Sequence, residues 1–157
     1  MCSKYCIDTS ALLDAWLRWY PPDIFPGLWG KLDQLINESR LIATEEVFIE
    51  LSHKEDLLYE WAGERQNKFF IPLDEPIQLE VTQILTTFPK LVDQRPGKGT
   101  ADPFVIALAK ITNAIVVTGE LPTNNLQRPK MPDVCDQLNI QCIKITELIR
   151  MENWTFT

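Results

Sequence analysis

The sequence has a single histidine, and this scarcity excludes several classes of enzyme site. Nucleases that use two histidines as acid and base, HExxH metalloproteases and zinc sites with three histidines all need more than one imidazole. A serine triad would have to use His53, which directly follows Ser52, and the chain contains no segment resembling a nucleophile elbow. Carboxylates are therefore the abundant reactive side chains.

Positive charge is also in short supply. Lys and Arg number 15 against 22 Asp and Glu in 157 residues, which gives a net charge of −7. A broad basic face that holds nucleic acid by charge alone is not expected from this balance. Chemistry on a phosphate group would then need a metal ion or a small local group of cations.

Long apolar runs are missing as well. No stretch approaches the roughly 18 apolar residues that a membrane span requires. Residues 1–22 do not resemble a signal peptide, because Asp8, Asp14 and Arg18 interrupt their apolar run. The four cysteines form no CxxC pair, so free thiols are expected at Cys2, Cys6, Cys135 and Cys142. These features predict a cytoplasmic protein without a membrane segment.

Short apolar runs alternate with segments that have apolar residues at helical spacing. Strands are expected at residues 4–7, 40–43, 114–118 and 140–145, with a further extended run at 69–71. Helices are expected at residues 9–20, about 23–36, 45–61 with a bend near 53, 77–88, 102–111, and after 146 with Thr146 as its cap. This alternation predicts one domain over residues 1–157, a three-layer α/β/α sandwich with a short central parallel sheet.

Four carboxylates fall where an open parallel sheet builds its sites, beyond the carboxyl ends of the strands. Asp8 closes the first strand, and Glu120 follows the strand at 114–118 by two residues. Asp102 opens the preceding helix, and Glu50 lies in the helix after the second strand. Each has a purely structural interpretation: Asp8 and Asp102 as N-caps, Glu50 and Glu120 as solvent-exposed residues.

Convergence of these acids on one edge would favour a function. Two carboxylates about 4 Å apart repel each other by about 4 kcal/mol at an effective dielectric constant of 20, and proteins relieve this by protonation or by binding a cation. Oxygen ligands without histidine or a positioned thiolate favour Mg²⁺ or Mn²⁺ over zinc.

Four segments carry a resemblance to a known family. Residues 6–13 (CIDTSALL), 45–51 (EEVFIEL), 101–107 (ADPFVIA) and 115–120 (IVVTGE) resemble, in order, the four acidic motifs of PIN-domain nucleases. The match is closest to the small prokaryotic members that act as ribonuclease toxins in toxin–antitoxin pairs. The resemblance implies a metal-dependent ribonuclease that hydrolyses RNA and leaves a 5′-phosphate and a 3′-hydroxyl.

The resemblance also implies roles for individual residues. The catalytic and metal-binding group would be Asp8, Glu50, Asp102 and Glu120, with Mg²⁺ or Mn²⁺ as cofactor. Thr9 or Ser10 would bind a substrate phosphate or orient Asp8. The fourth motif usually ends in Asp rather than Glu. The loop at residues 121–131 also replaces a shorter connection, so Asp133 is an alternative to Glu120. In the second motif Glu45 and Glu46 are rivals of Glu50, although both suit the first turn of a helix.

Cations near the acids suggest where RNA is held. Arg95 and Lys98 precede Asp102 among glycines, and Arg128 and Lys130 lie in the loop after Glu120. They are interpreted either as contacts to an RNA backbone or as ordinary solvent-exposed loop cations.

The helix at residues 9–20 has a wide apolar sector that includes Leu12, Leu13, Trp16, Leu17, Trp19 and Tyr20. It is explained either by burial or by an interface with an antitoxin or with a second copy of the chain in a homodimer. Two other functions compete with the nuclease. One is a catalytically silent PIN-like module that binds protein or RNA, and the other is a phosphatase with Asp8 as nucleophile, which would want an acid where Ser10 stands.

Overall fold

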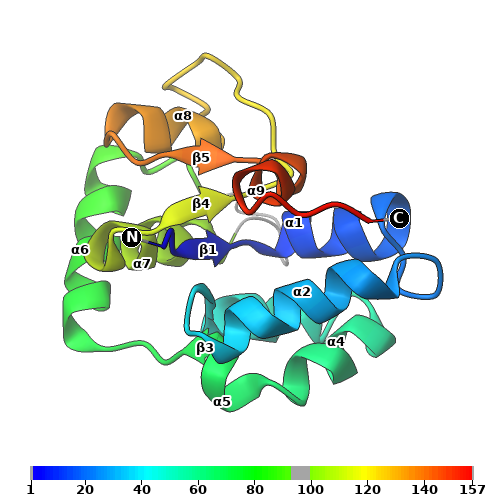
Figure 1. The fold of residues 1–157 in the computed structure, drawn as a ribbon. Coiled ribbons are helices and arrows are strands. Elements are labelled where there is room, and N and C mark those ends of the chain that lie inside the picture. Colours follow the sequence, from blue (N-terminus) through cyan, green and yellow to red (C-terminus); the bar gives the residue numbers. More distant parts are fainter. Residues whose placement is uncertain (1, 93–99, 157) are drawn as a thin grey trace.

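Five short parallel strands form the centre of the computed structural model, which describes residues 2–92 and 100–156. Their order across the sheet is β3-β2-β1-β4-β5 (Figure 1). The strands are β1 (Tyr5–Ile7), β2 (Leu41–Thr44), β3 (Phe70–Ile71), β4 (Ile115–Val117) and β5 (Cys142–Ile143). All pairs are parallel, so their carboxyl ends meet at one edge.

Strand β1 lies in the middle of the sheet and fixes the register of the edge. Ile7 pairs with Val117 on β4, and the Asp8 amide donates a hydrogen bond to the Val117 carbonyl at 3.0 Å. The side chains of β1 are fully buried, as expected for a parallel strand covered on both faces. The first polar residue after the strand, Asp8, therefore stands at the edge beside the residues that follow β4.

Helices cover both faces of this sheet. They are α1 (Thr9–Asp14), η1 (Ala15–Trp19), α2 (Pro26–Asn37), α3 (Glu45–Leu51), α4 (Asp56–Gly63), α5 (Gln66–Phe69), α6 (Glu75–Thr87), α7 (Asp102–Thr112), α8 (Met131–Gln137) and α9 (Ile145–Met151). Contacts link α1 with α3, and α2 and α4 with α5, in one layer, whereas α7 packs against α6 and α8 in the other. Right-handed crossovers account for this division, since the chain moves outward from β1 to β3 and then returns to β4 and β5. The fold is the expected three-layer α/β/α sandwich.

Helix starts follow local capping chemistry in most places. The side chain of Asp8 caps α1 by accepting a hydrogen bond from the Ala11 amide at 2.8 Å, and Thr44 caps α3 as expected. The expected cap at Thr146 is wrong: α9 begins at Ile145 after Lys144, because β5 ends at Ile143 and the helix follows it at once. Two helices, α5 and α8, were not expected from the sequence.

The segment 9–20 is not one regular α-helix. After α1, residues Ala15–Trp19 form a π-helix, whose wider turn closes with a 2.8 Å hydrogen bond from the Tyr20 amide to the Ala15 carbonyl. Tyr20 precedes Pro21, which disfavours the α-helical conformation, and it leaves the helix with φ −140°. The Pro-Pro sequence thus ends the helix at the expected place.

The wide apolar sector of this segment divides between core and surface. Trp16 packs edge-on against Trp29 with ring centres 4.8 Å apart, and both rings contact Trp61. Leu17 and Trp19 point outward and are 56% and 62% exposed. Burial therefore explains one side of the segment and leaves Trp19 on the surface.

The helices also bear on the expected absence of a membrane segment. None in residues 2–92 and 100–156 combines the length and apolar character that crossing a bilayer requires.

Candidate metal centre

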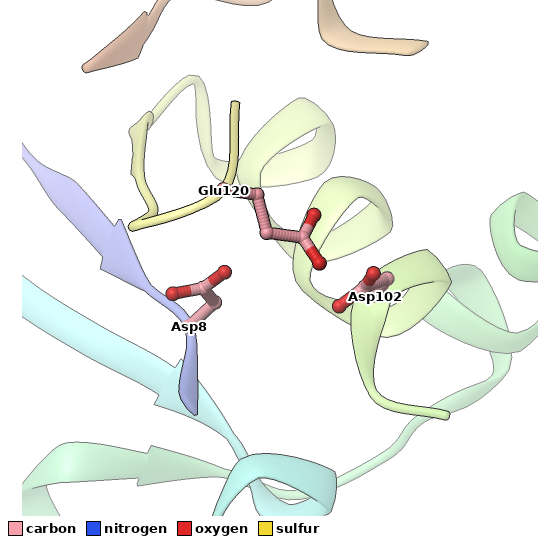
Figure 2. Close-up of side chains that lie close together, drawn as sticks. All are labelled: Asp8, Asp102 and Glu120. Atoms are coloured by element: carbon pink, nitrogen blue, oxygen red, sulfur yellow. The ribbon is translucent and has the colours of Figure 1, made fainter. Parts of the chain in front are cut away.

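Three carboxylates meet at the carboxyl edge of the sheet. Asp8 follows β1, Glu120 follows β4, and Asp102 is the first residue of α7. Figure 2 shows the three side chains pointing toward a shared space, and one oxygen of each lies within 4.8 Å of one oxygen of each of the others. We call this set the acid triad. Residues far apart in the sequence are thus brought together by the sheet register and by the start of one helix.

Asp8 is held by donors on both of its carboxylate oxygens. The Ser10 hydroxyl lies 2.9 Å from each oxygen, the Ala11 amide donates to Oδ1, and the Thr118 hydroxyl donates to Oδ2. Burial and the charge of Glu120 raise the pKa of Asp8 from 3.8 to about 7, although these hydrogen bonds oppose the increase. Asp8 is therefore both the helix cap and a member of the acid triad.

Asp102 does not cap its helix, contrary to the expectation. Ala101 occupies the N-cap position, so Asp102 is the first helical residue and Pro103 the second. Its carboxylate is free to turn into the edge of the sheet, where it is 8% exposed. Burial, followed by the charges of Glu120, Asp8 and Glu50, raises the pKa of Asp102 well above its usual value.

Glu120 is held by the segment that leads into α8. Its Oε2 accepts a hydrogen bond from the Met131 amide at 3.1 Å, and its own amide donates to the Thr118 hydroxyl. The longer Glu side chain spans the distance from the end of β4 to Asp102. The Thr118 hydroxyl therefore contacts two members of the acid triad: it donates to the Asp8 carboxylate and accepts from the Glu120 backbone amide.

Glu50 lies beside the acid triad but is not one of its three members. One carboxylate oxygen accepts from the Thr9 hydroxyl at 2.5 Å, and the other accepts from the Thr100 hydroxyl at 2.9 Å and the Ala101 amide at 3.4 Å. Its charge raises the pKa of Asp102. Glu50 thus ties α1 to the start of α7, which carries Asp102.

The other acids weighed from the sequence lie elsewhere. Glu45 accepts a hydrogen bond from the Leu73 amide, and neither it nor Glu46 belongs to the acid triad. Asp133 accepts hydrogen bonds from the Thr123 and Lys130 amides, among others, and closes the loop before α8. Burial would raise the pKa of Asp133, but these hydrogen bonds outweigh it and lower the pKa. The geometry therefore favours Glu120 over Asp133 as the acid that follows β4.

The predicted substrate-binding residues have mixed positions. The hydroxyl of Thr9 donates to Glu50, and that of Ser10 donates to Asp8, so both act within the acid network. Ser10 also accepts a hydrogen bond from the Gly119 amide at 3.0 Å. Arg95 and Lys98 lie outside the described residues.

Gly119 shapes the same edge by lacking a side chain. A Cβ atom at this position would overlap the Asp14 carboxylate and lie 3.4 Å from the Ser10 carbonyl. A larger residue here would displace the Asp14 side chain from its position.

The comparisons with known proteins bear on the whole of this region. Residues 5–156 match the family described as "Domain of unknown function (DUF4411)". The chain belongs to this family. The comparison with curated proteins finds no match. The matched range contains the acid triad and Glu50, so the site lies inside the family's domain.

The donor set of the acid triad suits a hard divalent cation. It offers oxygen atoms alone, and Mg²⁺ and Mn²⁺ prefer carboxylate oxygens. The raised pKa values of Asp8 and Asp102 arise in part from neighbouring carboxylates, and a bound cation would remove that repulsion. The residues therefore fit the metal that the sequence predicts.

Proposed function

We propose that the chain is a metal-dependent ribonuclease that hydrolyses RNA phosphodiester bonds with Mg²⁺ or Mn²⁺ held by Asp8, Asp102 and Glu120. The observation that carries this proposal is the convergence of three carboxylates, two of them buried, at the carboxyl edge of a parallel sheet. Carboxylates held this close repel one another unless a cation offsets their charge. The three residues also come from the first, third and fourth of the acidic motifs found in the sequence. The chain's single histidine, His53, also leaves carboxylates as the available acid and base groups.

The surrounding residues would hold the triad in place for this reaction. Ser10 and Thr118 orient Asp8, and Glu50 fixes the start of α7 and thereby Asp102. When bound, the cation would lower the pKa of a water molecule and offset charge on the phosphodiester. Glu50 is proposed as a positioning residue at the border of the site.

The biological setting is part of the same proposal. The resemblance to small PIN-domain toxins supports a cytoplasmic ribonuclease that binds RNA and a cognate antitoxin protein. A second copy of the chain, in a homodimer, is a further candidate partner. Leu17 of the 9–20 segment, which is exposed, offers an apolar contact for such a protein. An antitoxin encoded beside this chain would be the observation that supports this setting most directly.

A cleavage assay tests the enzyme. The purified chain should cleave single-stranded RNA with Mg²⁺ or Mn²⁺ and stop in excess EDTA. Asp102→Asn should abolish cleavage, while Asp136→Asn, an equivalent change at an exposed position of α8, should leave it intact. Cleavage that persists in EDTA, or in Asp102→Asn at the wild-type rate, would contradict the metal mechanism. Inactivity on many RNAs with both metals would favour a silent binding module.

A further inference from the structure

A groove lies next to Asp8, since two of its lining residues, Ala11 and Thr118, hydrogen-bond the Asp8 carboxylate. It has a volume of about 390 Å³ and lies between η1 and the segment that joins β5 to α9. The Tyr20 hydroxyl lies 3.4 Å from the Thr146 hydroxyl and connects these two walls. The residues that matter most for its chemistry are Ala11, Arg18, Trp19, Thr118, Gly119 and Lys144.

The floor of the groove is also the support of the metal site. Ala11 and Thr118 line the groove, and both donate hydrogen bonds to the Asp8 carboxylate. Gly119, which also lines it, adds no side chain where one would collide with Asp14. The groove is therefore separated from the Asp8 carboxylate by the two residues, Ala11 and Thr118, that hydrogen-bond it.

The walls supply an aromatic surface and two cations. Trp19 lines the groove and is 62% exposed, although a tryptophan of this size is usually more buried. Within residues 2–92 and 100–156, Arg18 makes a single long ion pair, with Asp14 at 3.9 Å, and its side chain is 74% exposed. Lys144 is exposed on the opposite wall, and among the described residues it makes no ion pair.

This combination matches the chemistry of a nucleotide. Proteins bind single strands by stacking bases on aromatic side chains while cations contact the phosphates. Asp14 is the one carboxylate among the lining residues, so cations outnumber acids in the lining itself, in a chain whose net charge is −7. The volume lies near the lower end of ordinary ligand pockets and suits one nucleotide rather than a folded partner.

We propose that this groove holds one nucleotide of a single-stranded RNA, with its base stacked on Trp19 and its phosphate between Arg18 and Lys144. The inference rests on the proposed function in one respect, because it takes RNA to be the substrate whose scissile phosphate lies at the acid triad. The groove then fixes the direction in which the strand leaves the site. Trp19 then binds a base without distinguishing one base from another, since every base offers a face for stacking.

The test measures binding separately from cleavage. A fluorescein-labelled single-stranded oligouridylate is titrated with the full chain carrying Asp102→Asn, in Mg²⁺, and every further substitution is made in that background. Trp19→Ala should weaken binding about five- to 150-fold, the range that the loss of one stacked base implies. Trp19→Phe should restore most of the affinity. Leu79→Ala on α6, at a position 60% exposed, is the matched control and should leave affinity unchanged.

The cations are tested through salt dependence. Arg18→Gln and Lys144→Gln should each reduce the slope of log affinity against log salt by about 0.7, the value expected for one phosphate contact on a single strand. Lys68→Gln on α5, an exposed lysine near the opposite edge of the sheet, should not change the slope. Urea midpoints of all variants should match that of the parent, because the substituted side chains are exposed.

The outcomes separate this inference from the proposed function. If the wild-type chain cleaves RNA but Trp19→Ala binds the oligouridylate as tightly as its Asp102→Asn parent, the groove proposal is wrong and the ribonuclease stands. If the wild-type chain cleaves no RNA but binding depends on Trp19 and both cations, the groove stands and the ribonuclease fails. If RNA binding is unaffected while Trp19→Ala abolishes self-association or binding of a protein partner, the groove is a protein interface and the proposal is overturned.

Discussion

Replacing Asp8 with Asn gives the sharpest test of the acid triad, because it removes one buried charge at almost constant shape. In the folded chain Asp8 is 2% exposed and accepts hydrogen bonds from Ser10, Ala11 and Thr118. An Asn side chain keeps one acceptor oxygen for the Ala11 amide and presents an amide group to Thr118. If Asp8 were only a helix cap, this change would alter stability very little, since Asn caps about as well as Asp.

The expected magnitude follows from the pKa of Asp8. Burial and Glu120 raise this pKa from 3.8 to about 7, so the unfolded chain releases this proton at a lower pH than the folded chain. The free energy of unfolding of wild type is therefore highest below pH 3.8 and falls as the pH rises from 3.8 through 7. The total decrease is about 4 kcal/mol, because each tenfold change in proton affinity is worth about 1.4 kcal/mol. Weaker hydrogen bonding in Asp8→Asn costs about 1–2 kcal/mol at every pH. Without metal, the variant should therefore be less stable than wild type near pH 4 and more stable by about 2 kcal/mol at pH 8.

Urea unfolding of both proteins in EDTA, from pH 4 to pH 8, measures this difference. Mn²⁺ supplies the second arm: at a hundredfold excess over its dissociation constant it should stabilise wild type by about 2.7 kcal/mol and the variant far less. A difference between the two proteins that stays constant with pH would refute the electrostatic reasoning. Equal stabilisation by Mn²⁺ would show that Asp8 is not a ligand.

Three other substitutions test parts of the structure outside the triad. Asp133→Asn should lower the free energy of unfolding by about 1–2 kcal/mol at pH 7, measured by urea, and by less below pH 4, because a lowered pKa gives stability that is lost as the pH falls. Glu152→Gln should cost about 1–3 kcal/mol through its 2.6 Å ion pair with Arg40 and leave Mn²⁺ stabilisation unchanged, since this pair lies near the start of β1. Trp16→Ala should lower stability by about 2 kcal/mol through its packing with Trp29, and a variant as stable as wild type would contradict the aromatic cluster.

The layers of the fold could be predicted from the sequence because the strands are short apolar runs between helical patterns. The run at 114–118 contains β4 and exceeds it by one residue at each end, and the run at 4–7 contains β1 and begins one residue early. Buried parallel strands leave such continuous apolar signatures. The placement of carboxylates directly after these runs also followed, since the carboxyl ends of parallel strands share one edge.

Other features depended on contacts that a linear pattern does not contain. Asp102 resembled an N-cap before Pro103, but Ala101 takes that position and releases the carboxylate. The linear pattern also does not contain the hydrogen bonds that Glu50, a predicted metal ligand, accepts from Thr9, Thr100 and Ala101 beside the acid triad. For α8 the local signal was present, with Pro132 in the first turn and Asp133 in its capping box, but it was masked by the prolines and polar residues before it.

The position of β1 between β2 and β4 determines when the acid triad is able to form during translation. Thr118 stands 110 residues after Asp8, and the contact between them forms only when β4 pairs with β1. Such distant pairings close large loops and form slowly compared with local helices. A nascent chain therefore carries Asp8 from the start of synthesis but has no assembled acid triad until most of the chain has emerged. If the chain cleaves RNA, translation of its own message is nearly complete before the product is able to cut it.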